Sequence, residues 1–540
     1  MSMEPADPIK EMSEELLSYG SAIPLSLDHI AAVNRSRNVI LNYDSVAFCM
    51  PHLEGEEMIA SMLGSSDLRN SPVESIFWNW GEGNFASYPS KVLEPATVAR
   101  FPRWAEEGYD IIQECHDAAK ARGLESFFSY RINGGDNDRH EHGRHQVDLP
   151  RFKEKHPEML IYDSDSQLGL HTPRYNFAYE EVRDHKLAIL AEVFARYDFD
   201  GLEIDFQRAP PVLPLRQQWL FREELTKFIR SLRKMLQDRA EKIGHPILVA
   251  VRIPTTIYGC HSDGIDIERW VRDQLVDILV LGPRSYEHDY RGFLDLARDR
   301  NIKVYPCIDE IHSTDGYRNP PLEVFRGVFT NWAHQGFDGF QTFNWQNNDP
   351  CLPMGQGKDL DDWLDSQWRL HKRVYEELGS GIEDLDKTFV IQRRLGGHFI
   401  NRKLDAAKWK TPREGWGCQN VEAQLPAMIP EDADQDLFLH LYVGDTATDY
   451  GKRTLTILLS DTPDDQIKTL GAIHLAVQLR INGVLYTAPD ESDGAVCVWK
   501  LDDEDVFAEG DNLIQVAHSQ RYGRPNVWVE KVELELRSKK

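Results

Sequence analysis

The chain has 540 residues, of which 41% are hydrophobic and 28% charged, and its formal net charge is −27 at pH 7. That length allows two to four domains, one of them large enough for a complete barrel. An acidic surface repels nucleic acids and anionic membranes, and no apolar run approaches the roughly 20 residues that cross a bilayer. We therefore expect neither nucleic acid nor membrane as a partner.

The N-terminal segment, MSMEPADPIKEMSEELL, is acidic and polar and lacks the pattern of a signal peptide. The seven cysteines are scattered and form no CxxC pair, which favours reduced thiols. Both observations predict a cytoplasmic protein, with a removed leader as the alternative. Residues 1–35 are expected to form an N-terminal extension.

Eight short apolar segments, each followed by a helical pattern, predict a parallel α/β architecture. We assign residues 36–385 to a (β/α)₈ barrel. An open doubly wound sheet is the structural rival, but the first segment ends in NYDSVAF, without a glycine-rich phosphate turn. The predicted strands are 38–44, 74–80, 124–133, 199–206, 246–254, 276–282, 302–309 and 337–345. The predicted helices are 104–123, 180–197, 221–244, 266–275, 290–300, 320–336 and 360–379.

Beyond residue 390 the apolar residues alternate with polar ones. Segments such as DLFLHLYV, TLTILLS and VWVEKVELEL are separated by turns rich in Gly, Asn, Asp and Pro. This pattern predicts an all-β antiparallel sandwich over residues 390–540. The stretches LRINGVLY and LDDEDVFAEGDNLIQVA resemble the jelly-roll modules attached to many glycosidases, some of which bind sugar while others are structural.

The fourth predicted strand, DGLEIDFQ, carries the clearest chemical signal, since reactive residues of such barrels lie at the carboxyl ends of strands. Alternation turns Glu203, Asp205 and Gln207 into the barrel and the apolar residues between them toward the helices. Two acids so close on one inward face should raise one pKa, which suits a general acid. The alternative is that these carboxylates only form ion pairs with barrel arginines.

The same stretch resembles the strand-four signature of family-eighteen chitinases, Asp-Gly-x-Asp-x-Asp-x-Glu. Glu203 and Asp205 match the two inner acids, but Gln207 replaces the glutamate that is the general acid of that family, so a chitinase mechanism is not expected. Residues 36–380 more closely resemble the family-ten-like glycoside hydrolases of environmental bacteria. The resemblance rests on RNVILNYD, WNWGEGNFASYPSKVL, LPRFKEKHPEML, FDGLEIDFQR and IDIERWVRDQLVDILVLG.

A glycosidase needs a second carboxylate across the scissile bond. By resemblance to barrel glycosidases that place the acid/base after strand four and the nucleophile at strand seven, Asp205 or Glu203 is paired with Glu310 or Asp309. Glu203 is deeper and is expected to orient Asp205. The acids of strand seven are alternatively turn residues. Asp44, at the end of strand one, is a candidate for substrate binding or a hydrogen-bond acceptor at the rim.

Arginines recur at the ends of several predicted strands, where they could bind a carboxylate or sulfate on a sugar. Alternatively, they only neutralise the barrel acids. The predicted substrate-binding arginines are Arg131, Arg208 and Arg252. Flat sugar faces pack on aromatic rings, and Trp80, Tyr286 and Trp345, with Asn344, are the corresponding candidates at the rim.

The loop 136–145, DNDRHEHGRH, holds histidines and acids but no zinc spacing, so we predict a solvated or substrate-facing loop and neither metal nor cofactor. The sequence as a whole predicts a glycoside hydrolase that acts on an oligosaccharide or polysaccharide, including an acidic one. The alternative is a carbohydrate-binding, lyase or isomerase barrel that lacks the two-carboxylate mechanism.

Overall fold

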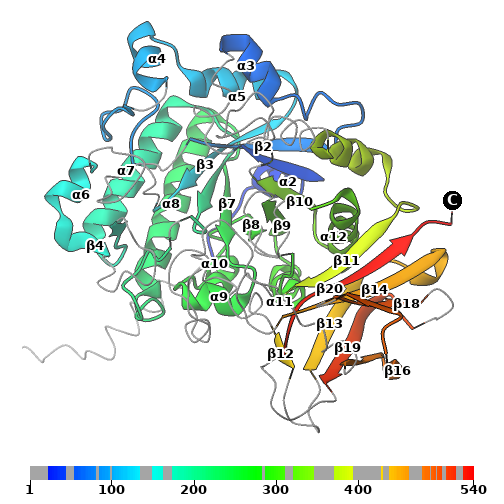
Figure 1. The fold of residues 1–540 in the computed structure, drawn as a ribbon. Helices are drawn as coiled ribbons and strands as arrows, with labels where there is room; N and C mark the ends of the chain where they lie inside the picture. Colours follow the sequence, from blue (N-terminus) through cyan, green and yellow to red (C-terminus); the bar gives the residue numbers. More distant parts are fainter. Residues whose placement is uncertain are drawn as a thin grey trace, which may run out of the picture.

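The chain folds into a closed eight-stranded barrel followed by an antiparallel β-sandwich (Figure 1). The structure is a computed structural model. It describes residues 22–43, 54–80, 84–97, 100–133, 149–161, 173–208, 210–282, 286–309, 320–343, 345, 370–392, 427–429, 437–460, 477–486, 488–493, 496–501, 506–518 and 527–539.

All neighbouring strands of the barrel are parallel, and β1 closes the sheet by pairing with both β2 and β10. Each barrel strand overlaps one predicted strand, so the predicted barrel is confirmed and the open sheet is excluded. A small hairpin, β4 and β5, lies outside the barrel between β3 and α7. The barrel strands are β1 (Val39–Tyr43), β2 (Val73–Asn79), β3 (Glu125–Arg131), β6 (Gly201–Asp205), β7 (Leu248–Ile253), β8 (Ile278–Leu281), β9 (Lys303–Asp309) and β10 (Phe340–Phe343), and the hairpin strands are β4 (Leu160–Ile161) and β5 (Arg174–Tyr175).

Helices surround the barrel, and five of the seven predicted helical segments contain one helix at or near the expected bounds. The predicted helix 104–123 is instead two helices, because Gly108 adopts a left-handed conformation (φ 70°) that ends α4. Of the predicted helix 360–379, only the part from 370 onward is described, and it is helical. The helices are α2 (Leu27–Val33), α3 (Gly55–Met62), α4 (Phe101–Glu107), α5 (Ile111–Ala121), α6 (Arg151–Lys155), α7 (Glu180–Arg196), α8 (Arg222–Ile243), α9 (Ile257–Ser262), α10 (Ile267–Arg272), α11 (Tyr290–Ala297) and α12 (Leu322–Gln335).

The amino end of the barrel is covered by α2, which lies in the predicted extension 1–35, and by Arg37, which lies in the predicted barrel 36–385. In α2, His29 Nε2 lies 3.0 Å from Asp277 Oδ1, at the entry to β8. Arg37 donates to both carboxylate oxygens of the buried Glu125, over 2.5 and 2.8 Å. Residues 22–37 therefore pack against the barrel and cover its amino end. The carboxyl end is the end that remains for a functional site.

The β-sandwich consists of two antiparallel sheets, ordered β11-β20-β14-β18-β17, with β12 on β20, and β13-β19-β15-β16. It begins at Lys387, slightly before the predicted residue 390. β11, β12, β16 and β17 were not predicted, since three of them have only three residues and show no period. The strands are β11 (Lys387–Gln392), β12 (Ala427–Ile429), β13 (Leu437–Val443), β14 (Lys452–Ser460), β15 (Val477–Ile481), β16 (Val484–Tyr486), β17 (Glu491–Asp493), β18 (Val496–Lys500), β19 (Gly510–His518) and β20 (Val527–Arg537).

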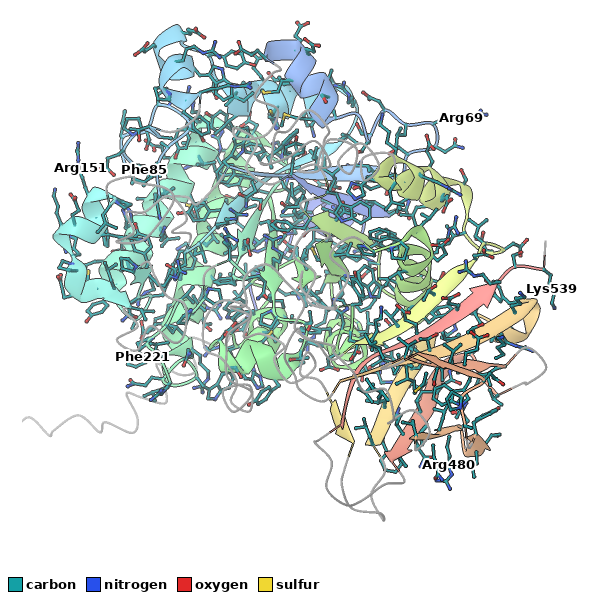
Figure 2. All side chains as sticks on the ribbon, in the orientation of Figure 1. Arg69, Phe85, Arg151, Phe221, Arg480 and Lys539 are labelled. Atoms are coloured by element: carbon teal, nitrogen blue, oxygen red, sulfur yellow. The ribbon has the colours of Figure 1, made fainter. Side chains whose placement is uncertain are left out.

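The sandwich packs tightly against α12 of the barrel. A Cβ at Gly327 would lie 2.1 Å from the carbonyl oxygen of Thr388, so only glycine lets β11 approach this helix. Asn331 donates to the carbonyl of Tyr442 over 3.0 Å and accepts from the backbone N–H of Gly444 over 2.8 Å. Side chains fill the interiors of the barrel and of the sandwich (Figure 2).

In the part of the chain that the structure describes, every helix is too short or too polar to cross a membrane. The four described cysteines, Cys115, Cys260, Cys307 and Cys497, are buried free thiols.

Candidate functional site

Strand β6 turns its acids into the barrel, as the alternation predicts, while Leu202 and Ile204 belong to the apolar shell between strands and helices. Glu203 is completely buried and accepts three hydrogen bonds from other inward-facing side chains. The donors are Asn42 Nδ2 (2.7 Å), Ser129 Oγ (2.5 Å) and Gln341 Nε2 (2.8 Å). Glu203 therefore ties four strands together in the middle of the barrel.

Burial raises the pKa of Glu203 above its ordinary value of 4.5. The positive charge of Arg252 opposes this shift, and the negative charge of Asp205 adds to it. The raised pKa that the sequence predicted for this pair is thus present at Glu203, with burial rather than like charge as its main cause.

Asp205, one layer closer to the carboxyl end, is 1% exposed and uses both of its oxygens as acceptors. Oδ1 accepts the backbone N–H groups of Gln207 (2.8 Å) and Arg208 (3.2 Å), which fixes the turn after the strand. Oδ2 accepts a hydrogen bond from Arg252 Nη2, and Arg131 Nε lies 4.0 Å away. The ion pair that the sequence left as an alternative is therefore present between Asp205 and Arg252.

Arg252 is the most informative residue of the site. It is 1% exposed, and its guanidinium carbon lies 3.8 Å from the centroid of the Phe343 ring. Nη2 is bonded to Asp205, but Nε and Nη1 are buried and have no hydrogen-bond partner among the described residues. Burial acts against its charge, yet the pKa is raised because the carboxylates of Asp205 and Glu203 outweigh burial. Buried N–H groups without acceptors are costly and need a physical explanation.

Two neighbours of this ion pair also have buried polar atoms without partners. Within the described part of the chain, Asn42 Oδ1 has no partner although its amide nitrogen binds Glu203, and Gln207 Nε2 has none although its backbone N–H binds Asp205. We call Asn42, Glu203, Asp205, Gln207 and Arg252 the polar floor of the barrel. It offers unused N–H donors together with one unused acceptor, a combination that matches an acidic group and a neighbouring hydroxyl.

Other predicted site residues are only partly described. Asp309 ends β9 opposite Phe343 in the strand register, and only its backbone is described. Arg131 is buried beside Asp205, and Arg208 contributes its backbone N–H to that carboxylate. The remaining candidates and the histidine-containing loop lie outside the described residues, namely Asp44, Glu310, Asn344 and loop 136–145.

Two of the predicted rim aromatics lie away from the polar floor. Trp345 is 1% exposed and packs against His371 (4.7 Å between ring centroids) and Phe325 (4.9 Å), in the shell outside the barrel. Tyr286 is nearly buried in the same shell, where its carbonyl accepts from Trp332 Nε1 over 3.3 Å. Strand alternation cannot place residues that follow a strand, so the prediction of Trp345 as a sugar platform is corrected to a packing role.

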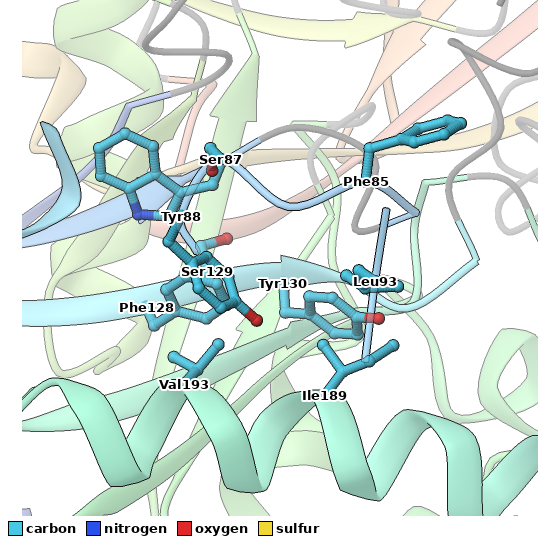
Figure 3. A pocket seen from close by; sticks show the side chains of 10 residues that line it. Phe85, Ser87, Tyr88, Leu93, Phe128, Ser129, Tyr130, Ile189 and Val193 are labelled. Carbon is cyan, nitrogen blue, oxygen red and sulfur yellow. The ribbon is translucent and has the colours of Figure 1, made fainter. Parts of the chain in front are cut away.

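Trp80 stays near the surface, where it lines a small pocket between β3, α7 and the segment 85–93. Tyr130, Ile189 and Val193 form its lower wall, and Tyr88 and Ser87 lie above them (Figure 3). The lining is largely apolar, and Trp80 stacks on Trp78 with 6.5 Å between ring centroids. The pocket is a packing space on the outer side of β3 rather than part of the polar floor.

Sequence reasoning missed the three side chains that hold Glu203. Asn42, Ser129 and Gln341 each occupy an inward position among apolar inward neighbours, such as Ile40, and that signal was available in the strand pattern. Within the described ranges, no cluster of three metal-ligating side chains is present.

No family model and no curated protein sequence matches the chain. Solved structures with a similar fold include glycosidases. An α-L-fucosidase isoenzyme from Paenibacillus thiaminolyticus is 12% identical over 65% of this chain, with a TM-score of 0.41, and the chain spans 52% of its length. An Anoxybacillus α-amylase is 10% identical over 90% of this chain and 98% of its own, with a TM-score of 0.39. A chitinase from Pseudoalteromonas aurantia is 13% identical over 61% of this chain and 99% of its own, with a TM-score of 0.32.

Proposed function

We propose that this chain is a glycoside hydrolase whose oligosaccharide or polysaccharide substrate carries an acidic group. The observation that carries the proposal is the buried guanidinium of Arg252 at the carboxyl end of the barrel, because no described residue supplies an acceptor for its Nε and Nη1. The N–H of Nε lies on the same side as Nη2 and Nη1 lies on the side of Cδ, so the two groups point in different directions, and each can donate a separate hydrogen bond to an oxygen of an acidic ligand.

The rest of the polar floor suits a sugar that bears such a group. No described residue pairs with Asn42 Oδ1, which can accept from a ring hydroxyl, or with Gln207 Nε2, which can donate to another sugar oxygen. Phe343 holds the guanidinium in place before any ligand arrives. A site held in position in this way loses less conformational entropy when it binds.

For the chemistry we propose Asp205 with a carboxylate from the end of strand seven, Glu310 or Asp309. Asp205 is the described carboxylate nearest to the carboxyl end of β6, and we propose that the negative charge of Glu203, one layer below, tunes it. Hydrolysis needs two carboxyl groups on opposite sides of the glycosidic bond, about 5–10 Å apart.

One observation favours the alternative, a barrel that binds a sugar or eliminates across it without hydrolysis. Both described acids of β6 are already engaged in hydrogen bonds, and an amide, Gln207, occupies the next inward position. An amide cannot exchange a proton with a leaving group as a carboxylic acid does.

Product analysis separates the two functions. The purified protein is incubated with neutral, uronic-acid-containing and sulfated oligosaccharides, and the products are identified by mass spectrometry. Hydrolysis adds one water across the two products of each cleavage, whereas elimination adds none and leaves an unsaturated sugar. We expect the water-added products from an acidic substrate. Binding without conversion, or unsaturated products, would contradict the hydrolase proposal.

A further inference from the structure

Large apolar side chains gather on the surface at one side of the barrel mouth. Leu220 is 71% exposed, Tyr258 58% and Trp219 40%, although aromatic side chains are normally covered. We call these three residues, with His261, the rim shelf. None of them was singled out from the sequence.

The rim shelf belongs to the loops that follow the strands of the polar floor. Trp219 and Leu220 precede α8, in the connection after β6, and Tyr258 and His261 lie in α9, which follows β7 (Figure 1). Tyr258 is six residues beyond Arg252. Six residues of chain reach at most about 20 Å, so the shelf and the floor are within reach of one oligosaccharide.

The two loops are fixed against each other. Gly264 has a φ of +75°, and a Cβ there would lie 2.5 Å from the carbonyl oxygen of Gln218, so a larger residue would force the loops apart. The rings of Trp219 and His261 are 4.4 Å apart, and Tyr258 lies one turn before His261 on the same side of α9.

Hydrogen bonds and a cation–π contact fix the side chains of the rim shelf in place. Arg222 donates to the carbonyl of Trp219 over 2.8 Å, and its guanidinium carbon lies 4.5 Å from the indole ring. His261 Nε2 is 2.8 Å from Glu268 Oε1, and Thr256 caps the start of α9 through a hydrogen bond from Gly259 N–H (2.9 Å). The aromatic surface is thus ordered before a ligand binds, which reduces the entropic cost of binding.

We propose that the rim shelf binds a further sugar ring of the substrate, beyond the unit that reaches Arg252, with Tyr258 as the stacking ring. This proposal rests on the proposed function, because it takes the occupant to be a saccharide. A pyranose has one apolar face of C–H groups, which suits an exposed phenol ring, and its rim of hydroxyls can stay in water. The substrate is accordingly a chain of several sugars rather than a monosaccharide derivative.

The test measures how affinity depends on chain length. Calorimetric titration uses fragments of polygalacturonate of one to six units, and cello-oligosaccharides of one to six units as the neutral series. We expect the affinity of the unsubstituted protein to rise with length, and Tyr258→Ala to lower the ratio of the affinities for long and short fragments about 3- to 10-fold. Trp219→Ala should lower the same ratio. Both residues lie on the surface, so the variants should melt like the parent protein.

Phe438→Ala is the matched control, because this ring is 55% exposed on the sandwich, and the ratio should not change. The proposal is overturned if the ratio of affinities is unchanged in both shelf variants. It is also overturned if affinity falls equally for fragments of every length, or if neither series binds. Binding is measured without turnover, so the two proposals can fail separately. Length-dependent binding of fragments that the protein does not cleave would support the rim shelf as a sugar-binding site and contradict the proposed hydrolase activity.

Discussion

The guanidinium of Arg252 lies over the ring of Phe343, with 3.8 Å between the guanidinium carbon and the ring centroid, in the interior of the barrel. A desolvated contact of this kind stabilises the charged side chain by about 2 kcal/mol. It also covers one face of the guanidinium, so that a ligand can approach only along the edges. Because Asp205 accepts from Nη2, the N–H groups of Nε and Nη1, which point in different directions, are the donors that no described residue uses.

Arg252→Met should therefore weaken the binding of acidic sugars more than the binding of neutral sugars. A charge-assisted hydrogen bond is worth about 1.5–3 kcal/mol, which corresponds to about 10- to 150-fold in affinity. The measurement compares the dissociation constants of galacturonic acid and galactose for parent and variant. Arg131→Met, which removes the second cation near Asp205, is expected to act in the same direction. An equal loss for the acid and for the neutral sugar would leave only the charge-balance role for these arginines.

Asp205→Asn should retain substrate binding and lower kcat by about 10²–10⁴-fold, the range of a lost proton transfer. It should also cost stability, because breaking a buried ion pair leaves Arg252 uncompensated, at up to about 3–5 kcal/mol. Turnover near the parental rate would show that the acids of β6 are only an internal ion-pair network.

Asp277→Asn is the matched control for that experiment. Asp277 is as buried as Asp205 and pairs with Arg233 over 2.6 and 2.8 Å, but it precedes β8 at the amino end of the barrel. We expect a comparable loss of unfolding free energy with kcat unchanged. If kcat falls in both variants, the loss of activity is explained by the loss of stability alone.

Glu310→Gln tests the predicted partner of Asp205. If Glu310 is nucleophile or base, kcat should fall by a similar factor, and the double variant should lose little more than the worse single one, because groups that act as a unit are not additive. Strictly additive losses in single-turnover measurements would separate the two residues into independent roles.

The barrel was predictable because its signal is local: each strand is a short apolar run, and alternation alone decides that Glu203 and Asp205 face inward. What lies opposite them is not local. The register of β6 against β7 sets Asp205 beside Arg252, and closure of the sheet brings Asn42 and Gln341 to Glu203. Strand order and register depend on the packing of the whole sheet, which no single segment encodes.

The same limit explains the aromatic residues. Trp345 and Tyr258 both follow barrel strands, and both are large, yet one is buried and the other is exposed. The difference comes from the helix at 370–380, which covers Trp345. Whether a residue after a strand faces the mouth or the outer shell depends on such distant elements.

His185 should make the fold sensitive to acid. Its ring stacks on Phe152 with 4.3 Å between ring centroids, and burial, followed by the charges of Lys186 and His156, lowers its pKa from 6.5 to about 3. The unfolded chain takes up this proton near pH 6.5 and the folded chain only near pH 3. Stability is therefore complete above pH 6.5 and falls by about 1.4 kcal/mol per pH unit below it.

His185→Phe preserves the stack and removes the titration. Denaturant unfolding between pH 7 and pH 4 should give a shallower decline for the variant than for the parent protein. Parallel declines would mean that the proton is accommodated in the folded state.

Glu203→Gln separates the positioning role of this residue from the chemistry at Asp205. The carboxylate accepts from three donors, whereas an amide has one acceptor and one donating end. In one orientation the amide –NH₂ faces the donor Gln341 Nε2, and in the other it faces the donor Asn42 Nδ2, so two donors oppose each other in either case. We expect a loss of unfolding free energy of about 1–3 kcal/mol, and a smaller fall in kcat than for Asp205→Asn.

The pH dependence of that loss identifies its cause. In the parent protein the pKa of Glu203 is raised above 4.5, so the folded state holds this proton more tightly than the unfolded state, and the contribution to stability falls as the pH rises past 4.5. The glutamine variant has no ionisable group at this position, so its stability lacks this pH dependence. The difference in unfolding free energy between parent and variant should therefore shrink from pH 4 to pH 7, measured by denaturant titration at each pH. A difference that grows over this range would mean that the three donors stabilise the ionised carboxylate more than burial destabilises it, and that Glu203 acts as a fixed negative charge beneath Arg252.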